Sequence, residues 1–241
     1  MSFFITLSSV AIMLCYAIPG YIFVKTKKIS PNAIPAFANV LMYLCSPCLT
    51  IYSFTKADFT YSLIKDIVIL FICSMIIQIA ILGFFYILLK NKIENVRYRI
   101  CIIATTLGNC AFMGVPLLEA IMPDYPEAII MSVIFCAGMN LIGWTLASAI
   151  ITNDRKYISL KKALLNPVML ALVIAIPLFV THTKLPSQID NMITLVGRMS
   201  TPMCMLIMGM RLATVALKSL FTDKLQYATV FIKQNLKHIL W

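Results

Sequence analysis

Helix-breaking and polar residues lie close together in one apolar stretch of the sequence. The stretch ATTLGNCAFMGVPLLEA contains Gly108, Asn109, Gly114 and Pro116. In a helix interior, glycine costs about 1 kcal/mol and proline about 3 kcal/mol relative to alanine, and a buried amide needs a partner. The spacing predicts a broken helix, because Pro116 has no N–H for the carbonyl of Phe112 and glycine permits non-helical backbone. The second half-helix would then present unpaired N–H groups to an anion.

A second interpretation of this stretch is a kinked but packed helix, since glycine and proline are frequent in membrane-spanning helices. Arg198 is the other residue that could bind a ligand, because it lies within an apolar run, four residues before Pro202. The sequence leaves three roles open for this side chain: to hold a substrate carboxylate, to pair with an acid, or to reach lipid headgroups if its helix begins later than expected. Glu119 is a carboxylate within an apolar run, and we expect it near the outer interface.

These residues belong to a chain that is too apolar for an ordinary water-facing surface. Of its 241 residues, 61% are hydrophobic and 12% charged, and the mean hydropathy is +0.93. The apolar segments are continuous rather than alternating, which predicts an all-α polytopic membrane protein with about seven spanning helices. The predicted spans are Phe3–Val24, Ile34–Phe54, Ile67–Leu89, Ile100–Met122, Ala128–Ile151, Ala163–Val180 and Ile189–Met210.

Lysine and arginine gather in alternate loops, which accounts for the net charge of +11 without a nucleic-acid site. Eleven of these basic residues follow the first, third and fifth predicted spans. The loops after the second, fourth and sixth spans contain only Lys56, Lys65 and Lys184. Basic loops stay cytoplasmic, so we expect the N-terminus outside a cell membrane. The eleven residues are Lys25, Lys27, Lys28, Lys90, Lys92, Arg97, Arg99, Arg155, Lys156, Lys161 and Lys162.

The sequence shows few signs of an enzyme or a metal site. It has no glycine-rich phosphate loop, HExxH or GxSxG motif, and His182 and His238 stand alone. Eight cysteines are spread over the predicted spans, where they act as small apolar residues. Two of them, Cys45 and Cys48, form a lone CxxC pattern, which leaves a thiol enzyme as a minor alternative. We therefore expect no cofactor. The polar residues expected to hydrogen-bond between helices are Asn39, Gln78 and Asn140.

A weak internal repeat relates the first two predicted spans to the sixth and seventh. AIPGYIFVKTKKISP and YLCSPCL in the first pair match AIPLFVTHTKLP and RMSTPMCM in the second, in the same order. An odd number of spans separates the copies, so the second copy would be inverted in the membrane, as in many carriers. We predict a first five-helix repeat over residues 1–151 and an incomplete second repeat over residues 152–241. The matched prolines are Pro19 with Pro177, Pro31 with Pro186, and Pro47 with Pro202.

Several of these segments resemble the auxin efflux carrier family of membrane transport proteins, in its bacterial branch. LMYLCSPCLTIYSF, GNCAFMGVPLL and STPMCMLIMGMRLA carry the resemblance, which covers roughly residues 5 to 225. It implies two inverted five-helix repeats, with helices four and nine broken and crossing at the substrate site, and secondary transport of small organic anions such as malate. Protons or sodium ions are the candidate coupling ions. The predicted substrate-binding residues are Gly108, Asn109, Phe112, Gly114, Pro116 and Arg198, with Pro47 and Pro202 bending helices two and seven around them.

The chain departs from the family pattern after Ala213. A basic segment, TVALKSLFTDKLQ, is followed by YATVFIKQNLKHILW, in which Lys233 and Lys237 interrupt the expected eighth helix. We therefore expect a C-terminally truncated carrier that lacks helices eight to ten. The alternative function is a non-transporting membrane fragment that at most binds a second copy, which leaves a homodimer open.

Overall fold

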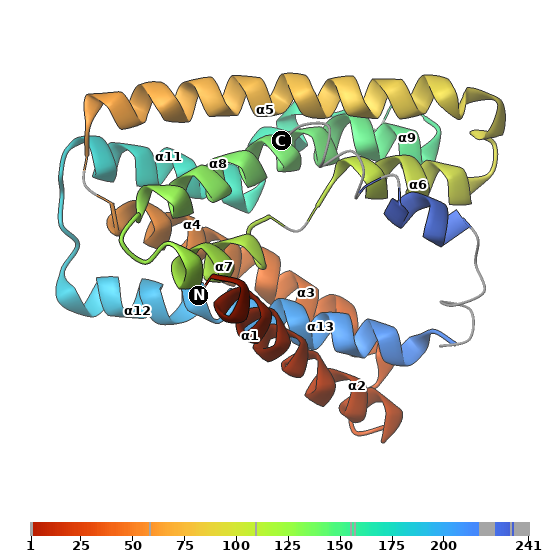
Figure 1. Cartoon of the computed structure of the whole chain (residues 1–241), viewed down its shortest axis with the longest axis horizontal. Coiled ribbons are helices and arrows are strands. Elements are labelled where there is room, and N and C mark those ends of the chain that lie inside the picture. The colour runs from red at the N-terminus through yellow and green to blue at the C-terminus, as the bar shows by residue number, and fades with distance from the viewer. Residues whose placement is uncertain are drawn as a thin grey trace.

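The regular secondary structure in the described part of the chain is all helical. The computed structural model describes residues 2–57, 59–108, 110–154, 156, 158–216, 225–231 and 233 (Figure 1). Its elements are α1 (Ser2–Cys15), α2 (Ala17–Lys25), η1 (Pro31–Ala33), α3 (Ile34–Val40), η2 (Leu41–Cys45), α4 (Ser46–Thr55), α5 (Tyr61–Leu88), η3 (Lys90–Lys92), α6 (Val96–Thr106), α7 (Gly114–Ile121), α8 (Glu127–Ile142), η4 (Gly143–Ala147), α9 (Ser148–Thr152), α10 (Leu160–Leu164), α11 (Pro167–Val180), α12 (Ser187–Arg198) and α13 (Ser200–Thr214).

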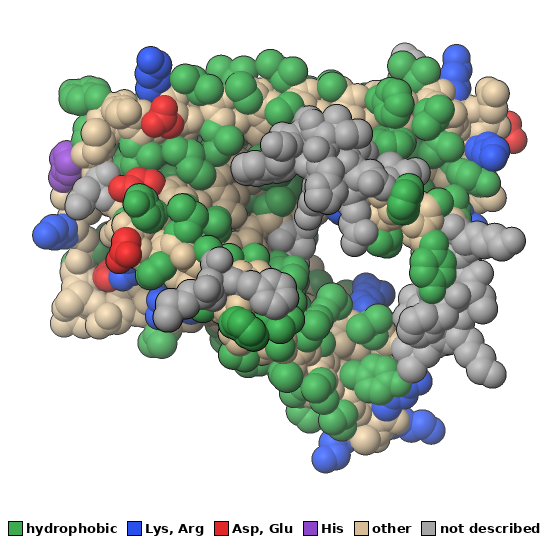
Figure 2. Space-filling view, viewed as in Figure 1, with side chains coloured by type: hydrophobic (Ala, Val, Ile, Leu, Met, Phe, Trp, Pro, Cys, Tyr) green, Lys and Arg blue, Asp and Glu red, His purple; other side chains and the backbone are tan. Residues whose placement is uncertain are grey.

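Among the described residues, five helical segments are long and apolar enough to cross a membrane, which confirms an all-α polytopic membrane protein. They correspond to the first, second, third, fifth and seventh predicted spans. Apolar side chains are spread over the face shown in Figure 2, and basic side chains lie mostly at its margins. The segments are Phe4–Lys25, Pro31–Thr55, Tyr61–Leu88, Glu127–Thr152 and Ser187–Thr214.

The fourth and sixth predicted spans are not continuous helices. The fourth is divided into α6 and α7, as expected from its glycines and proline. The sixth was expected to begin at Ala163, but α11 begins at Pro167 and has only 14 residues. The Oδ1 of Asn166 accepts a hydrogen bond from the N–H of Val168 at 2.8 Å, which caps α11, and Pro167 cannot continue the preceding helix.

The backbone departs from α-helical geometry just before each of the two prolines that were predicted to bend helices. The π-helical segment η2 ends at Cys45, two residues before Pro47, and the Ser46 hydroxyl donates to the carbonyl of Leu41 at 2.9 Å. In the seventh span, α12 ends at Arg198, four residues before Pro202. A second π-helical segment, η4, lies in the fifth span without a proline, and the sequence did not predict it.

The spans pack so that helices one, two, six and seven lie together. α2 contacts α13, and α4 contacts both α11 and α12. Glycines permit the closest of these contacts: a Cβ on Gly20 would overlap the carbonyl of Leu206, and one on Gly209 would overlap that of Ala17. Gly197 lies equally close to helix two, since its Cβ would be 3.1 Å from the Cα of Leu49.

The loops alternate between two ends of the molecule. In Figure 1 the turns after the first, third and fifth spans lie to the right, and those after the second, fourth and sixth lie to the left. The long helix α5 runs between the two ends along one edge and packs on α8. One buried apolar cluster includes Ala111, which lies between α6 and α7, and links it to neighbouring spans: Leu49, Tyr52, Ala111, Val115, Ile129, Val133 and Ile193.

Candidate functional site

The break between α6 and α7 is held by hydroxyl groups from neighbouring helices. The Thr201 hydroxyl donates to the carbonyl of Phe112 at 2.8 Å, and the Ser132 hydroxyl donates to the carbonyl of Cys110 at 2.9 Å. Phe112 is four residues before Pro116, so its carbonyl is the acceptor that Pro116 cannot serve. Irregular backbone inside a membrane protein requires such partners, because lipid supplies none.

The glycines of the break have different surroundings. A Cβ on Gly114 would lie 3.0 Å from the Ser132 hydroxyl, so a larger residue there would disturb the bond from Ser132 to the break. Gly108 lies on the other side, where its Cβ would be 3.9 Å from the Nζ of Lys233. Asn109 lies outside the described residues, and its role as a ligand stays a prediction.

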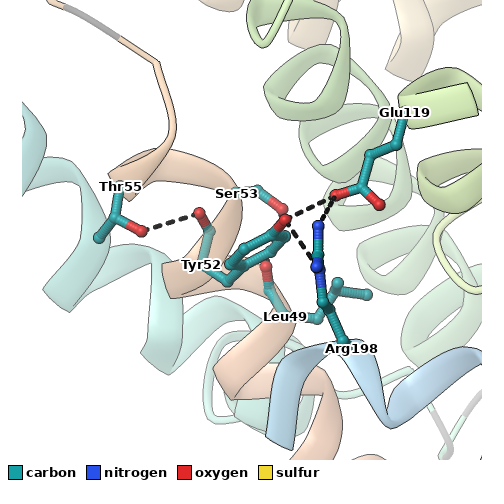
Figure 3. A network of polar contacts seen from close by, with 6 residues as sticks. All are labelled: Leu49, Tyr52, Ser53, Thr55, Glu119 and Arg198. Carbon is teal, nitrogen blue, oxygen red and sulfur yellow. Dashed lines mark hydrogen bonds and ion pairs between the residues drawn. The ribbon is translucent and has the colours of Figure 1, made fainter. Parts of the chain in front are cut away.

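Three polar side chains from three spans meet beside the break. Tyr52 of α4 donates its hydroxyl proton to Glu119 Oε1 of α7 at 2.7 Å and accepts a hydrogen bond from Arg198 Nε of α12 at 3.2 Å (Figure 3). Arg198 Nη2 lies 3.8 Å from the same carboxylate oxygen. Tyr52 is buried, whereas 62% of the Arg198 side chain and 26% of the Glu119 side chain are exposed. Of the three roles considered for Arg198, pairing with an acid is the one observed.

Arg198 retains hydrogen-bonding capacity in this arrangement. A guanidinium carries five N–H donors, and within the described residues Arg198 makes one hydrogen bond, through Nε. The separation of 3.8 Å between Nη2 and Glu119 is an ion pair but too long for a hydrogen bond. The Nη donors of Arg198 are therefore able to bind a further acceptor.

These three residues line a cavity of about 290 Å³, which we call the Tyr52 cavity. Its walls come from four spans, the first, second, fourth and seventh. This volume is at the lower limit of the about 300–1,000 Å³ usual for small-molecule sites. The lining residues are Ser9, Ile12, Met13, Tyr16, Leu49, Tyr52, Val115, Pro116, Glu119, Gly197, Arg198, Thr201 and Pro202.

A second cavity, of about 180 Å³, lies on the other side of Leu49, and we call it the Asn166 cavity. Leu49 lines both cavities. The side chain of Asn166 is buried, and its Nδ2 has no hydrogen-bond partner within the described residues. The lining residues are Ala38, Leu41, Met42, Ser46, Leu49, Thr50, Ala111, Phe112, Val133, Cys136, Asn140, Trp144, Asn166 and Val168.

The structure thus divides the predicted site residues between two cavities. Pro116, Arg198 and Pro202 line the Tyr52 cavity, and Phe112 lines the Asn166 cavity. Pro47 lines neither of them. Sequence reasoning did not find Tyr52, although a tyrosine hydroxyl within an apolar span needs a partner and is a signal for such a residue.

Within the described residues, none of the three side chains expected to hydrogen-bond between helices forms such a bond. Gln78 is buried in α5, and neither of its side-chain polar atoms has a partner within the described ranges. Asn140 contacts Cys136 Sγ of its own helix at 3.7 Å, and Asn39 is exposed. Residue type thus gave the polarity of these positions but not the direction in which each helix presents it. In the CxxC pattern, Cys45 is fully buried and Cys48 is half-buried.

The comparisons with known proteins agree with this architecture. No curated protein shows significant similarity to the chain. The family model described as "Membrane transport protein" matches residues 5–160 and 152–234, which include the break, both cavities and Lys233. The chain therefore belongs to this family of membrane transport proteins, the auxin efflux carrier family.

Proposed function

We propose that this membrane transporter is a secondary carrier of small organic anions, malate-sized carboxylates among them, and that it works by alternating access. The observation that carries the proposal is the pair of cavities on the two sides of Leu49. Along the second span, the Asn166 cavity is lined from Ala38 to Thr50, whereas the Tyr52 cavity is lined by Leu49 and Tyr52. The Asn166 cavity is therefore nearer to the basic loop after α2, and the Tyr52 cavity is nearer to the opposite end.

The chemistry of the Tyr52 cavity favours an anion. Planar guanidinium groups bind carboxylates through two parallel hydrogen bonds, and the Nη donors of Arg198 are able to form them. Glu119 is the internal carboxylate that a bound anion would displace, because it already pairs with Arg198 at 3.8 Å. Tyr52 keeps the guanidinium oriented in both states through the bond to Nε.

The break supplies a second set of groups for an anion. The N-terminus of α7 begins at Gly114, and the positive end of a helix dipole favours negative charge. Val115 and Pro116 of this turn line the Tyr52 cavity. In our proposal Asn109 contributes a hydrogen bond to the ligand, and Pro116 keeps the helix broken.

The test is uptake and efflux of labelled dicarboxylates and aromatic acids in vesicles that contain the purified full chain. A set of imposed pH and sodium gradients identifies the coupling ion. Arg198→Gln is expected to lower transport at least tenfold, because it removes the charged donors, while Arg211→Gln, an exposed arginine of α13, serves as the matched control. Equal transport by both variants contradicts the role of Arg198. Absence of transport by the correctly inserted wild-type chain favours the alternative, a non-transporting fragment.

A further inference from the structure

The C-terminal end of α6 presents carbonyl groups within the fourth span. The last four carbonyls of a helix have no donor within that helix, and they carry the negative end of its dipole. α6 ends at Thr106, and Leu107 is already extended, with φ −92° and ψ 133°. The N–H of Leu107 donates to the carbonyl of Ile103 at 2.8 Å, whereas the carbonyls of Ala104 and Leu107 need partners from elsewhere in the protein.

A lysine far along the chain supplies that partner. Lys233 Nζ donates to the carbonyl of Ala104 at 2.7 Å and to that of Leu107 at 2.8 Å. Distances of this length are typical of hydrogen bonds with a charged donor. Lys233 follows the helical segment 225–231, which lies beside α6 (Figure 1). Gly108 lies beside the ammonium group, since a Cβ there would be 3.9 Å from Nζ, an ordinary contact distance.

We propose that the carbonyls of Ala104 and Leu107 form a binding site for a monovalent cation, and that the Lys233 ammonium group is its built-in occupant. Two neutral carbonyls at a helix C-terminus favour a single positive charge over a divalent ion, which requires more oxygen ligands and usually carboxylates. In this structure the site is filled by the protein itself, so the wild-type chain requires no inorganic cation there. When the Lys233 side chain is removed, a small free cation takes its place.

The experiment measures thermal unfolding of the purified full-length chain and its Lys233→Ala variant in ammonium, methylammonium, potassium or sodium chloride. N-methylglucamine chloride at equal ionic strength corrects for general salt effects, because that cation is too large for the site. The variant is expected to unfold several degrees below the wild type. Ammonium or methylammonium should restore its stability with a saturable dependence on concentration, whereas the wild type should not respond.

Control variants separate this site from general effects of charge. Lys184→Ala removes a loop lysine and should show no response that is specific to the cation, and Lys233→Arg should behave like the wild type. If Lys233→Ala does not survive purification, the same comparison is made with Lys233→Met, which keeps an apolar stem. Recovery of folded variant in ammonium but not in N-methylglucamine supports the site. If the Lys233 variants are equally stable in all cations, or fail to fold in all of them, the proposed cation site is overturned. Neither result depends on whether the chain transports a substrate.

Discussion

The hydroxyl of Thr201 and the carbonyl of Phe112 form the contact that links the broken helix to the seventh span. Pro116 leaves that carbonyl without its helical donor, and Thr201 supplies a donor at 2.8 Å. Thr201 is itself followed by Pro202, and its side chain is buried. The two proline-containing segments are thus joined by a hydrogen bond that exists only because one of them lacks an N–H.

Replacing Thr201 tests the energetic importance of this contact. Thr201→Val keeps the shape of the side chain but leaves a carbonyl inside the protein without a donor, which costs about 1–3 kcal/mol. The free energy of unfolding in a denaturant series should fall by that amount. Thr152→Val is the matched control, since the Thr152 hydroxyl bonds within its own exposed helical turn, to Ser148. Equal losses in the two variants would contradict a special role for Thr201.

Glu119 competes with the proposed anion for Arg198, which gives a prediction about affinity. Glu119→Gln removes a negative charge 3.8 Å from the guanidinium, and ion pairs as exposed as this one are worth about 0.2–1 kcal/mol. Binding of a labelled dicarboxylate should therefore become tighter, by at most about fivefold in Kd. Tyr52→Phe should weaken it, because Arg198 loses its orienting bond; Tyr61→Phe, at an exposed tyrosine, is the control. Weaker binding by Glu119→Gln would argue that the carboxylate contacts the ligand directly.

Asn109 is the residue on which the sequence-based hypothesis rests most directly. If its amide binds the anion, Asn109→Ala should abolish stabilisation by malate-sized anions while membrane insertion is unchanged. Asn109→Asp should be worse, since an ionised carboxylate repels an anion at close range. Thermal unfolding with and without the anion measures both effects. Equal stabilisation of wild type and Asn109→Ala would favour the interpretation of a kinked, packed helix.

At the scale of elements, glycine controls the approach of helix one to helix seven. Gly20 of α2 and Gly209 of α13 face the backbone of the opposite helix so closely that neither position has room for a Cβ. Small residues allow such crossings in membranes, where packing rather than water drives helix association. The first span, through α1, and the seventh span, through α13, both contribute residues to the Tyr52 cavity, so their separation affects its shape.

Alanine substitutions test this packing. Gly20→Ala must push α2 away from the Leu206 carbonyl, and overpacking of this kind costs about 1–3 kcal/mol or more. Gly83→Ala is the matched control, because a Cβ at Gly83 in α5 meets no atom within 4 Å, and alanine favours a helix interior by about 1 kcal/mol. The melting temperatures should therefore move in opposite directions. A stabilised Gly20→Ala would show that the two helices are not held at this distance.

At the scale of the whole molecule, the alternation of loops gives the chain a direction in the membrane. The basic loops lie at one end of the molecule, and we predict that this end is cytoplasmic. With native cysteines replaced, Lys184→Cys should react with an impermeant thiol reagent applied to intact cells, whereas Lys27→Cys should react only after permeabilisation. Labelling of position 27 from outside would reverse the orientation.

The helix contacts also bear on the predicted inverted repeat. In the predicted repeat, helix one corresponds to helix six and helix two to helix seven. If helix one contacts helix seven, this symmetry therefore predicts a contact between helix six and helix two. Both contacts are present, as α2 with α13 and α11 with α4. This pairing supports the proposal of two inverted repeats, over residues 1–151 and 152–241, whose direct test is superposition of Pro47 on Pro202.

The sequence by itself determined the membrane class, the positions of most spans and the break in the fourth. These follow from local chemistry: continuous apolar runs of spanning length, and glycine and proline within one of them. It also identified Arg198, because a charge in an apolar run is costly wherever it points. Even so, it placed the start of α11 too early, since the capping of a helix by Asn166 competes with the apolar pattern.

Only the tertiary structure decided which side chains meet. Glu119 lies 67 residues after Tyr52 along the chain, and Arg198 lies 146 residues after it. The three side chains nevertheless share hydrogen bonds and an ion pair, because α4, α7 and α12 converge. The rotation of each helix about its axis sets these contacts, and in lipid an apolar sequence fixes that rotation weakly, since all its faces are apolar. Packing of Gly197 on helix two and the bonds from Thr201 and Ser132 fix it instead, and they divide the predicted site between two cavities.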